Sequence, residues 1–463
     1  MTSLSLASMA EAVRMLRSRF IKPSELVESC LSKIEMHDTK LNAYITICAQ
    51  QAREAAVLAD QDIEREIPRG LLHGIPVALK DIYDTAGILT TCHSKLFETR
   101  VPEDDCDAWE RLSANGAILL GKTSTHEFAT GGPSFDLPWP PARNPWNTEH
   151  VPAGSSSGSA AAVAAGMAFL AMGSDTGGSI RSPAGVNGLS GFKPSYGRLS
   201  RRGIFPLSWT QDHAGPIARN TEDCAFAMQV LAGHDPKDPA SVNAPVPDFL
   251  SGLNRPIKGM RIGWCTNWYE AEAEANILKT MKEAAETLKW LGAEIVPVEL
   301  PSLADFHACG RIIILSEAYA IHRRWIASNP ELYGEFFRLR TRLGAFISAD
   351  QYVDALRWRR MLAASLVEKM ANLELVLTAN QNGPAETFEN SQQDYHFFDK
   401  SSLMMPANIS GQPALTIRGG FAKNGLPLGI QLIGRSFADA DLLRVGHQFE
   451  QARSDLHSWP KLQ

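Results

Sequence analysis

Apolar residues near the start of the chain recur at helical spacing. In residues 23–38, five of them fall on one face at an interval of about 3.6 residues, namely Leu26, Val27, Cys30, Leu31 and Ile34. This pattern predicts an amphipathic helix packed on a core, and residues 1–70 are predicted to be mainly helical. The longest apolar run, residues 160–172, is rich in alanine. It is too short to span a bilayer and predicts a buried helix.

Short apolar runs alternate with helical patterns along the rest of the chain. Ile75, Val77 and Leu79 predict a strand that ends at Lys80. The dipeptide Asn424-Gly425 predicts a hairpin turn between two late strands. Strands interleaved with helices indicate a sheet that is covered on both faces. The remaining strands are predicted at residues 117–120, 261–264, 294–298, 373–377, 413–420 and 429–434, and a long amphipathic helix at residues 273–291.

Residues 130–160 have a different character, because glycine and proline interrupt them at close intervals. Proline removes a backbone donor and fixes φ, so this segment is predicted to be an extended surface loop. No internal repeat, low-complexity tract or linker divides the sequence. A single domain over residues 1–463 is therefore predicted.

The composition of the 463 residues narrows the possible functions. With 45 Lys and Arg against 51 Asp and Glu, the formal net charge of −6 gives no overall attraction to phosphate backbones. The seven cysteines are widely spaced with no C-x-x-C pair, which is typical of a reducing compartment and argues against a zinc ribbon. The N-terminus lacks the pattern of a secretion signal. We therefore expect a cytoplasmic protein with no metal, no membrane contact and no nucleic-acid partner.

Two short motifs match well-known signatures in the wrong context. Residues 116–123 fit the P-loop expression G-x-x-x-x-G-K-T, but their apolar strand lies between the glycines rather than before them. Residues 154–158 fit the G-x-S-x-G expression of α/β-hydrolases, yet they follow a proline-rich loop instead of a buried strand. Neither motif is expected to serve the function that its expression denotes.

Three other segments combine the groups that are needed to hydrolyse an amide. Lys80 ends an apolar strand, Ser155 and Ser156 precede the alanine-rich run, and residues 173–181 read GSDTGGSIR. The reaction requires a nucleophile, a base and hydrogen-bond donors for the oxyanion. Because the glycines within residues 176–179 have no Cβ, consecutive N–H groups there can surround one oxygen.

The sequence resembles the amidase signature family of hydrolases. The resemblance rests on GIPVALKD at 74–81, AGSSSGSAAAVAAG at 153–166, GSDTGGSIRSPA at 173–184 and GFKPSYGRLS at 191–200, and weaker similarity spans the rest. It implies an α/β fold, with a twisted mixed β-sheet sandwiched between α-helical layers. Residues 1–70 would form N-terminal helices, residues from about 74 to 220 the signature core, and residues from about 310 to 360 a variable helical region.

The resemblance also implies roles for particular residues, and it implies no cofactor. Ser179 would be the nucleophile, Ser155 a bridging serine with a cis peptide, and Lys80 the base. Where the family usually has glycine after the serine pair, this chain has Ser157. The oxyanion hole would comprise Thr176, Gly177, Gly178 and Ser179, and the supporting residues would be Ser156 and Asp175.

Burial can lower the pKa of a lysine toward neutrality, and the strand before Lys80 is apolar, as that requires. Lys80 would then take the proton of Ser155 while Ser155 takes that of Ser179. The attack of Ser179 would form an acyl-enzyme, which water hydrolyses. The predicted function is therefore that of an amidase, which cleaves a carbon–nitrogen bond of a small-molecule amide.

The substrate pocket is expected to be walled by residues 130–141, residues 203–209 and the helical region. The polar run Asn380-Gln381-Asn382 could bind a second carbonyl, which would suit carbamates or biuret-type substrates. Primary amides, anilides, carbamates and urea derivatives all stay open, as does a homodimer. The candidate substrate-binding residues, which include aromatic side chains suited to an apolar substrate, are Gly131, Phe135, Phe205 and Trp209.

Three alternatives stay open. A Ser-His-Asp hydrolase would use Asp212 and His213, although adjacent side chains point in different directions. A glutaminase (A) subunit of a tRNA-dependent amidotransferase shares the signature, but Ser401 stands where an acidic residue would hold the ammonium of glutamine. A noncatalytic relic of the fold is disfavoured, because the proposed reacting residues are intact. A basic and aromatic cluster could bind RNA but is more typical of a solvated helix face, and it comprises Arg338, Arg340, Arg342, Trp358, Arg359 and Arg360.

Overall fold

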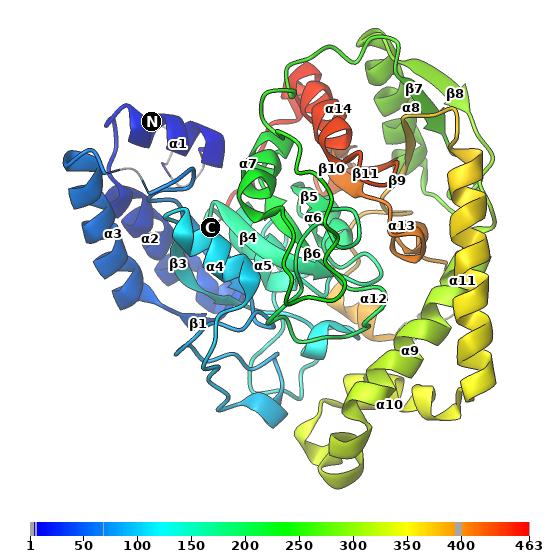
Figure 1. Cartoon of the computed structure of the whole chain (residues 1–463), viewed down its shortest axis with the longest axis horizontal. Coiled ribbons are helices and arrows are strands. Elements are labelled where there is room, and N and C mark those ends of the chain that lie inside the picture. The colour runs from blue at the N-terminus through cyan, green and yellow to red at the C-terminus, as the bar shows by residue number, and fades with distance from the viewer. Residues whose placement is uncertain (1–3, 5–6, 68, 394–400, 463) are drawn as a thin grey trace.

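An eleven-stranded mixed sheet crosses the computed structural model, which describes residue 4 and residues 7–67, 69–393 and 401–462 (Figure 1). Its strands are β1 (Tyr44–Ile47), β2 (Pro76–Lys80), β3 (Ile118–Thr123), β4 (Leu170–Asp175), β5 (Ser190–Lys193), β6 (His213–Ala218), β7 (Arg261–Trp264), β8 (Glu294–Pro297), β9 (Leu375–Ala379), β10 (Ala414–Phe421) and β11 (Pro427–Gly434). They are arranged in the order β1-β3-β2-β4-β6-β5-β10-β11-β9-β7-β8.

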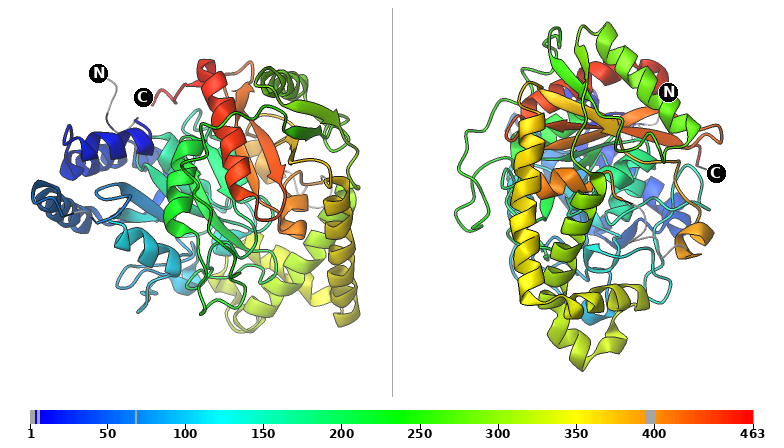
Figure 2. Two further views of the ribbon diagram at one scale, coloured as in Figure 1. Left: turned by 45° about the horizontal axis from the view of Figure 1, so that its top comes forward. Right: turned by 90° about the vertical axis from the view of Figure 1, so that its right-hand side faces the viewer.

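Helices cover both faces of this sheet (Figures 1 and 2). They are α1 (Met9–Arg17), α2 (Pro23–Leu41), α3 (Ala49–Glu64), α4 (Asp107–Ala114), α5 (Ser157–Ala164), α6 (Arg181–Val186), α7 (Thr221–Leu231), α8 (Ala275–Trp290), α9 (Leu303–Ser328), α10 (Glu335–Arg342), α11 (Ala349–Lys369), α12 (Phe388–Gln393), α13 (Met405–Ser410) and α14 (Asp439–Ala452). Gly429 of β11 lies against α6, whereas Gly419 of the adjacent β10 lies against Thr280 of α8. The mixed sheet therefore lies between helical layers, as predicted.

The central strands bring the candidate catalytic segments to one edge of the sheet. Every residue of β2 and of β4 is buried, which explains why both strands begin with apolar residues. β2 pairs in parallel with both β3 and β4, and parallel neighbours end at the same edge. Lys80 at the end of β2 and Ser174 near the end of β4 therefore lie close together. Helix α5 lies between β3 and β4 along the chain, so its start at Ser157, with Ser155 and Ser156 just before it, returns to this same edge.

The structure corrects the prediction for the alanine-rich run. Residues 160–172 do not form one helix, because α5 ends at Ala164 and Leu170 already begins β4. Gly166, with φ of 77°, lies in the turn between them. A short apolar run does not distinguish a buried helix from a buried strand, and glycine, which adopts positive φ without strain, allows the chain to switch here.

The segment that resembles a P-loop is strand β3. Lys122 lies within this strand and is buried. Its ammonium donates hydrogen bonds to the carbonyl of Tyr83 and to the hydroxyl of Thr90. The side chain of Lys122 is therefore buried and hydrogen-bonded within the core, and it does not face a phosphate-binding loop.

Helices α9, α10 and α11 form an arm at the end of the molecule opposite the N-terminal helices (Figure 1). Glu317 of α9 connects this arm to the body. Its carboxylate accepts hydrogen bonds from Ser208 Oγ at 2.5 Å, from Thr210 Oγ1 at 2.9 Å and from the hydroxyl of Tyr352 in α11 at 2.7 Å. The variable helical region is thereby fixed against the loop at residues 203–212.

Over the part of the chain that the structure describes, no helix is both long enough and apolar enough to cross a membrane. Within those same residues, no group of three or more His, Cys, Asp or Glu side chains is placed to hold a metal ion. All seven cysteines are buried and free.

Candidate active site

The amine of Lys80 lies at the centre of a cluster of serine hydroxyls. Its Nζ is 2.7 Å from Ser155 Oγ, 2.8 Å from Ser174 Oγ and 3.1 Å from Ser156 Oγ. Burial lowers the pKa of Lys80 to about 7, although the charges of Asp212 and Asp175 act in the opposite direction. A substantial fraction of the amine is therefore uncharged at neutral pH and can accept a proton from a neighbouring hydroxyl.

Ser155 follows a cis peptide bond, which joins it to Gly154. The imidazole of His126 packs so closely on Gly154 that a Cβ there would come within 2.3 Å of the ring. The backbone N–H of His126 also donates to the carbonyl of Ser155 at 3.0 Å. Burial lowers the pKa of His126 to about 3, and the charge of Lys80 adds to the effect, so the ring is neutral. His126 thus fixes the backbone that carries Ser155.

Asp175 shapes the turn that carries Ser179. Its carboxylate accepts hydrogen bonds from the N–H of Gly178 at 2.8 Å, from Nη2 of Arg181 at 2.9 Å and from Nδ2 of Asn408 at 2.9 Å. Burial alone would raise the pKa of Asp175, but the guanidinium of Arg181 outweighs it and holds the pKa below its usual value. The carboxylate therefore stays ionised and anchors the turn through these hydrogen bonds.

One predicted oxyanion donor is already engaged. The N–H of Gly178 donates to Asp175, and Gly178 does not line the cavity that contains Ser179. This glycine is required for another reason, since its φ is +118° and a Cβ would lie 2.4 Å from Cγ of Met404. The predicted role of Gly178 is corrected on this ground. The other three residues predicted for the oxyanion hole, Thr176, Gly177 and Ser179, do line the cavity.

Ser155 and Ser179 open into a cavity of about 200 Å³. Its walls come from three parts of the chain: the loop around Gly131, Leu207, and helices α9 and α10. Two of the side chains from those helices are charged, Arg311 and Arg340. The cavity is large enough for a small organic amide and combines nucleophilic, neutral polar and cationic groups.

Of the four candidate substrate-binding residues, Gly131 lines this cavity and the other three do not. Phe135 is half exposed, and its ring centroid lies 5.7 Å from that of Phe388. Phe205 and Trp209 line a smaller neighbouring cavity. The aromatic side chains therefore belong to the surroundings of the site, and they give no reason to expect an apolar substrate.

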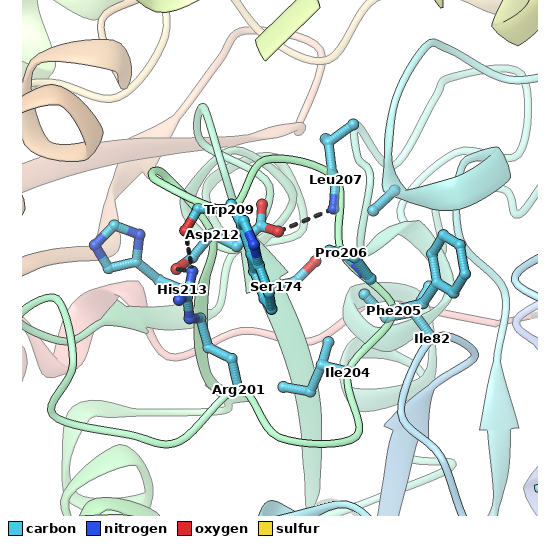
Figure 3. A pocket seen from close by; sticks show the side chains of 11 residues that line it. Ile82, Ser174, Arg201, Ile204, Phe205, Pro206, Leu207, Trp209, Asp212 and His213 are labelled. Atoms are coloured by element: carbon cyan, nitrogen blue, oxygen red, sulfur yellow. Dashed lines mark hydrogen bonds between the residues drawn. The ribbon is translucent and has the colours of Figure 1, made fainter. Parts of the chain in front are cut away.

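The smaller cavity is lined by Ser174, one of the serines that contact Lys80 (Figure 3). Its volume of about 10 Å³ has room for about one water molecule. Asp212, at its wall, accepts hydrogen bonds from the N–H of Leu207 at 2.9 Å and from Thr176 Oγ1 at 2.6 Å. His213 instead contacts the carbonyl of Gln211, with Nδ1 at 2.7 Å. The two neighbours have different partners, so the geometry does not favour a Ser-His-Asp relay.

The polar run at residues 380–382 also lies outside the catalytic cavity. Asn380 Nδ2 donates to the carbonyl of Arg181 at 3.1 Å and to Thr416 Oγ1 at 2.8 Å, so it braces α6 against the sheet. Asn382 Nδ2 donates to Glu272 at 3.2 Å. These contacts remove the reason for expecting a second carbonyl, and with it a carbamate or biuret group, at this run.

Sequence reasoning missed several residues of the site. Ser174 contacts Lys80, and its place just before Asp175 at the end of a strand was the available signal. Arg340 was assigned to a solvated face but lines the cavity. Arg359, from the same predicted cluster, donates from Nε to the carbonyl of Ile409 at 3.0 Å. Helical spacing shows which residues share a face, but it does not show what that face packs against.

Comparison with known proteins places these features in context. A family model described as Amidase matches residues 25–443. The A subunit of the glutamyl-tRNA(Gln) amidotransferase of Geobacter metallireducens is 37% identical over 462 residues, which cover 94% of this chain and 95% of that protein. The crystal structure of the corresponding protein from Thermotoga maritima has a TM-score of 0.85 at 30% identity, covering 100% of this chain and 99% of that one.

Two further solved structures are similar over nearly the whole chain. One comes from a vestigial protein complex that reveals the evolutionary origins of an s-triazine catabolic enzyme, with a TM-score of 0.90 at 28% identity and coverage of 99% of this chain and 100% of that one. The other is a bacterial aryl acylamidase, with a TM-score of 0.88 at 27% identity and coverage of 97% of each chain.

We expected the protein to act on a small-molecule substrate alone, with no nucleic-acid partner. These comparisons show that this expectation is wrong. The relatives from Geobacter metallireducens and Synechococcus are subunits of an amidotransferase that is named for glutamyl-tRNA(Gln). The net charge of a chain describes only its average field. It does not exclude a nucleic acid that is bound through a local patch or through another chain of an assembly.

Proposed function

The chain belongs to the amidase family, whose members hydrolyse carbon–nitrogen bonds, and on that basis we propose that it hydrolyses an amide through an acyl-enzyme on Ser179 and acts as the ammonia-releasing subunit of a larger assembly. The observation that carries the proposal is the 2.7 Å contact between Lys80 Nζ and Ser155 Oγ inside a buried cluster.

The first half of the reaction forms the acyl-enzyme. Uncharged Lys80 takes the proton of Ser155 as Ser155 takes that of Ser179, and Ser179 Oγ attacks the carbonyl carbon of the amide. The developing oxyanion accepts hydrogen bonds from the backbone N–H groups of Thr176, Gly177 and Ser179, whereas the N–H of Gly178 donates to Asp175. The proton returns through Ser155 to the nitrogen, because an amide anion does not leave unprotonated. The C–N bond breaks and ammonia or an amine departs.

The second half restores the enzyme. A water molecule gives a proton to the same relay and attacks the acyl carbon, and the C–O bond to Ser179 breaks. Ser179 regains its proton and the carboxylic acid departs. No change of oxidation state occurs in either half.

The role within an assembly is supported by the relatives, which are A subunits of amidotransferases and align with almost the whole chain. In such an assembly the ammonia released at Ser179 is transferred to an acceptor on another subunit. Glutamine is the first amide to test, because the A-subunit resemblance implies a glutaminase. Ser401, in place of the expected acidic residue, is the feature of this chain that departs from it.

The test compares the wild type with Ser179→Ala on glutamine, on simple primary amides and on anilides. We expect ammonia or amine release by the wild type alone, and hydroxamate formation when hydroxylamine replaces water at the acyl-enzyme. Turnover that survives in Ser179→Ala would refute the acyl-enzyme. The subunit role is tested separately, by conversion of glutamyl-tRNA(Gln) to glutaminyl-tRNA(Gln) in a mixture with the other subunits from the same source.

A further inference from the structure

Residues 126–131, which we call the linking segment, lie between the candidate bridging serine and the helical arm. His126 begins this segment and holds Gly154 with its ring and the carbonyl of Ser155 with its backbone N–H. At the other end of the segment, residues 129–131 line the catalytic cavity. Both ends of the linking segment therefore lie beside the reacting groups.

The middle of the linking segment contacts the arm instead. The carboxyl group of Glu127 accepts hydrogen bonds from Ser94 Oγ at 2.5 Å and from the N–H of Gly334 at 3.0 Å. Gly334 directly precedes helix α10, so this bond satisfies one of the backbone donors at the start of that helix. A second carboxyl group, that of Asp136, accepts a hydrogen bond from the N–H of Glu335 at 2.8 Å. Two side chains of the body therefore fix the start of α10.

Phe128, the next residue of the linking segment, is buried within a cluster of aromatic rings. Its ring centroid lies 4.5 Å from that of His322 in α9 and 5.4 Å from that of Phe337 in α10. Tilted and edge-on contacts between such rings are favourable. Burial lowers the pKa of His322 to about 3, so it packs as a neutral ring. The other rings around Phe128 are those of Phe97 at 5.4 Å, Phe205 at 5.0 Å and Tyr333 at 5.8 Å.

The linking segment connects the position of the Phe128 ring to that of His126. The backbone has a φ of +45° at Phe128 and +63° at Ala129, in the left-handed region that residues other than glycine rarely adopt. Such a conformation persists only where the surrounding contacts hold it. The N–H of Ala129 also donates to the carbonyl of His126 at 2.9 Å, which closes a tight turn. A shift of the Phe128 ring therefore displaces His126 as well.

We infer that Phe128 is a positioning residue for Ser155 and that the rings contributed by α9 and α10 hold it in place. Among the residues that the structure describes around the catalytic cavity, neither Phe128 nor Phe337 forms part of the wall. The inference rests on the proposed function, because it concerns the same serine relay. It adds that a movement of α10 changes the rate of proton transfer from outside the cavity.

Labelling of Ser179 with a fluorophosphonate measures the reactivity of the relay. Phe337→Leu removes the ring contact between α10 and Phe128. At saturating probe we expect its labelling rate to be at least about 10-fold below that of the wild type, because the relay depends on the exact position of Ser155. The probe concentration that gives half of the maximal rate should change less than about 3-fold, since the cavity wall is intact. An unchanged maximal rate, or a change in probe binding alone, would overturn the inference.

Phe306→Leu is the matched control. Phe306 is another fully buried phenylalanine of the arm, and its ring centroid lies 6.1 Å from that of Trp268. It is near the start of α9, about four helical turns before His322. Both variants lose ring packing, so both are expected to have a lower urea midpoint, but only Phe337→Leu should lose reactivity. An equal loss of labelling rate in the two variants would show that reduced stability is the cause.

A double-variant cycle tests whether Phe337 acts through Phe128. Phe128→Leu alone is expected to reduce the maximal labelling rate at least about 10-fold. If the two residues act along one path, the double variant Phe128→Leu/Phe337→Leu should match Phe128→Leu within about 3-fold. Losses that multiply would mean that the two residues act independently, and they would overturn the proposed path.

Hydrogen exchange tests the inference without relying on reactivity. The N–H of His126 is held by the carbonyl of Ser155, so its exchange reports whether this contact persists. In Phe337→Leu we expect peptides that cover residues 124–131 to exchange at least about 10-fold faster than in the wild type, and we expect no such change in Phe306→Leu. Unchanged exchange in Phe337→Leu would contradict the inference.

Failure of the inference and failure of the proposed function give different results. If Ser179 of the wild type is labelled and Phe337→Leu reacts equally fast, the inference falls and the proposed function stands. If the wild type is not labelled at Ser179 but exchange in the linking segment responds to Phe337→Leu, the acyl-enzyme falls and the coupling between α10 and Ser155 stands.

Discussion

The imidazole of His126 lies directly against Cα of Gly154, the residue before the candidate bridging serine. A Cβ at position 154 would come within 2.3 Å of Cε1 and 2.4 Å of Nε2 of this ring. The ring is buried, and its backbone N–H holds the carbonyl of Ser155. The position of Ser155 therefore depends on the shape of a neutral histidine as well as on its own loop.

Gly154→Ala is expected to disturb both stability and activity. The added methyl group cannot be accommodated unless the ring or the loop moves, and such overpacking costs about 1–3 kcal/mol. We expect a lower urea midpoint in equilibrium unfolding and a loss of turnover of about 100-fold or more, because a small misplacement of Ser155 interrupts the proton relay.

The double variant Gly154→Ala/His126→Ala separates these effects. It removes the clash, so its stability is expected to exceed that of Gly154→Ala, while activity stays low because Ser155 loses its packing. Additive losses of stability in the double variant would show that the ring contact is not the cause.

Lys80→Met is expected to change stability in a pH-dependent way. Burial lowers the pKa of Lys80 to about 7 in the folded state, whereas an unfolded lysine has a pKa of about 10.4. Between these values the unfolded state binds more protons, so the stability of the wild type rises with pH across this window. The cost of burying the charge is fully present below pH 7.

Removing that charge should stabilise the protein more at pH 6 than at pH 10, with a difference of about 2 kcal/mol or more in the free energy of unfolding. Urea titrations of wild type and variant at both pH values measure it. Lys279→Met, at an exposed position, is the control and should show no such difference. If Lys80→Met changed the free energy of unfolding equally at the two pH values, the pKa of Lys80 would not be lowered in the folded state.

Asp175→Asn is expected to destabilise the fold strongly. Both Asp175 and Arg181 are fully buried, and the variant leaves the guanidinium without its anion, at a cost of about 3–5 kcal/mol. Since the pKa of Asp175 is lowered in the folded state, its stabilising contribution is present above the ordinary aspartate pKa of about 3.9 and is lost as the pH falls below it.

Asp84→Asn provides the comparison for that experiment. Asp84 pairs with Arg100 at 2.8 Å, but both side chains are partly exposed, so its loss should cost no more than about 1 kcal/mol. Similar urea midpoints for the two variants would contradict the role of Asp175 as the anchor of the nucleophile turn.

Glu317→Gln is expected to loosen the attachment of the helical arm. Four donors from Ser208, Thr210 and Tyr352 converge on this carboxylate, and an amide presents N–H groups to some of them, with a cost of about 1.5–3 kcal/mol. Because Leu207 lines the cavity beside this contact, KM should rise more than kcat falls. Steady-state kinetics with Glu368→Gln, an exposed residue of α11, as the control would detect the difference. A fall in kcat alone would place Glu317 in the chemistry instead.

The strand that ends at Lys80 could be predicted, because a buried parallel strand has a continuous apolar pattern that ends where its polar residue begins. The order of the strands in the sheet could not be predicted, and β4 was expected to be part of a helix. The engagement of the Gly178 N–H could not. It depends on which backbone N–H group donates a hydrogen bond to the buried carboxylate of Asp175. The conformation of the turn determines which group this is. The catalytic roles themselves rest on the family resemblance and stay predictions.

The cavity wall was only partly predictable for a related reason. The helical region from about 310 to 360 was expected to contribute to the wall, but periodicity did not separate Arg340 from the exposed Arg342 on the same short helix. Their difference arises from long-range packing, in which Phe336 of α10 meets the loop at Gly131. Contacts between segments so far apart along the chain are not encoded in either local pattern.

The most direct test is covalent labelling with a fluorophosphonate, followed by peptide mass spectrometry. We predict a single adduct on Ser179, with a labelling rate that rises with pH through about 7 as Lys80 loses its proton and that falls at least about 100-fold in Lys80→Met. An adduct on another residue, or labelling of Lys80→Met at the rate of the wild type, would contradict the account.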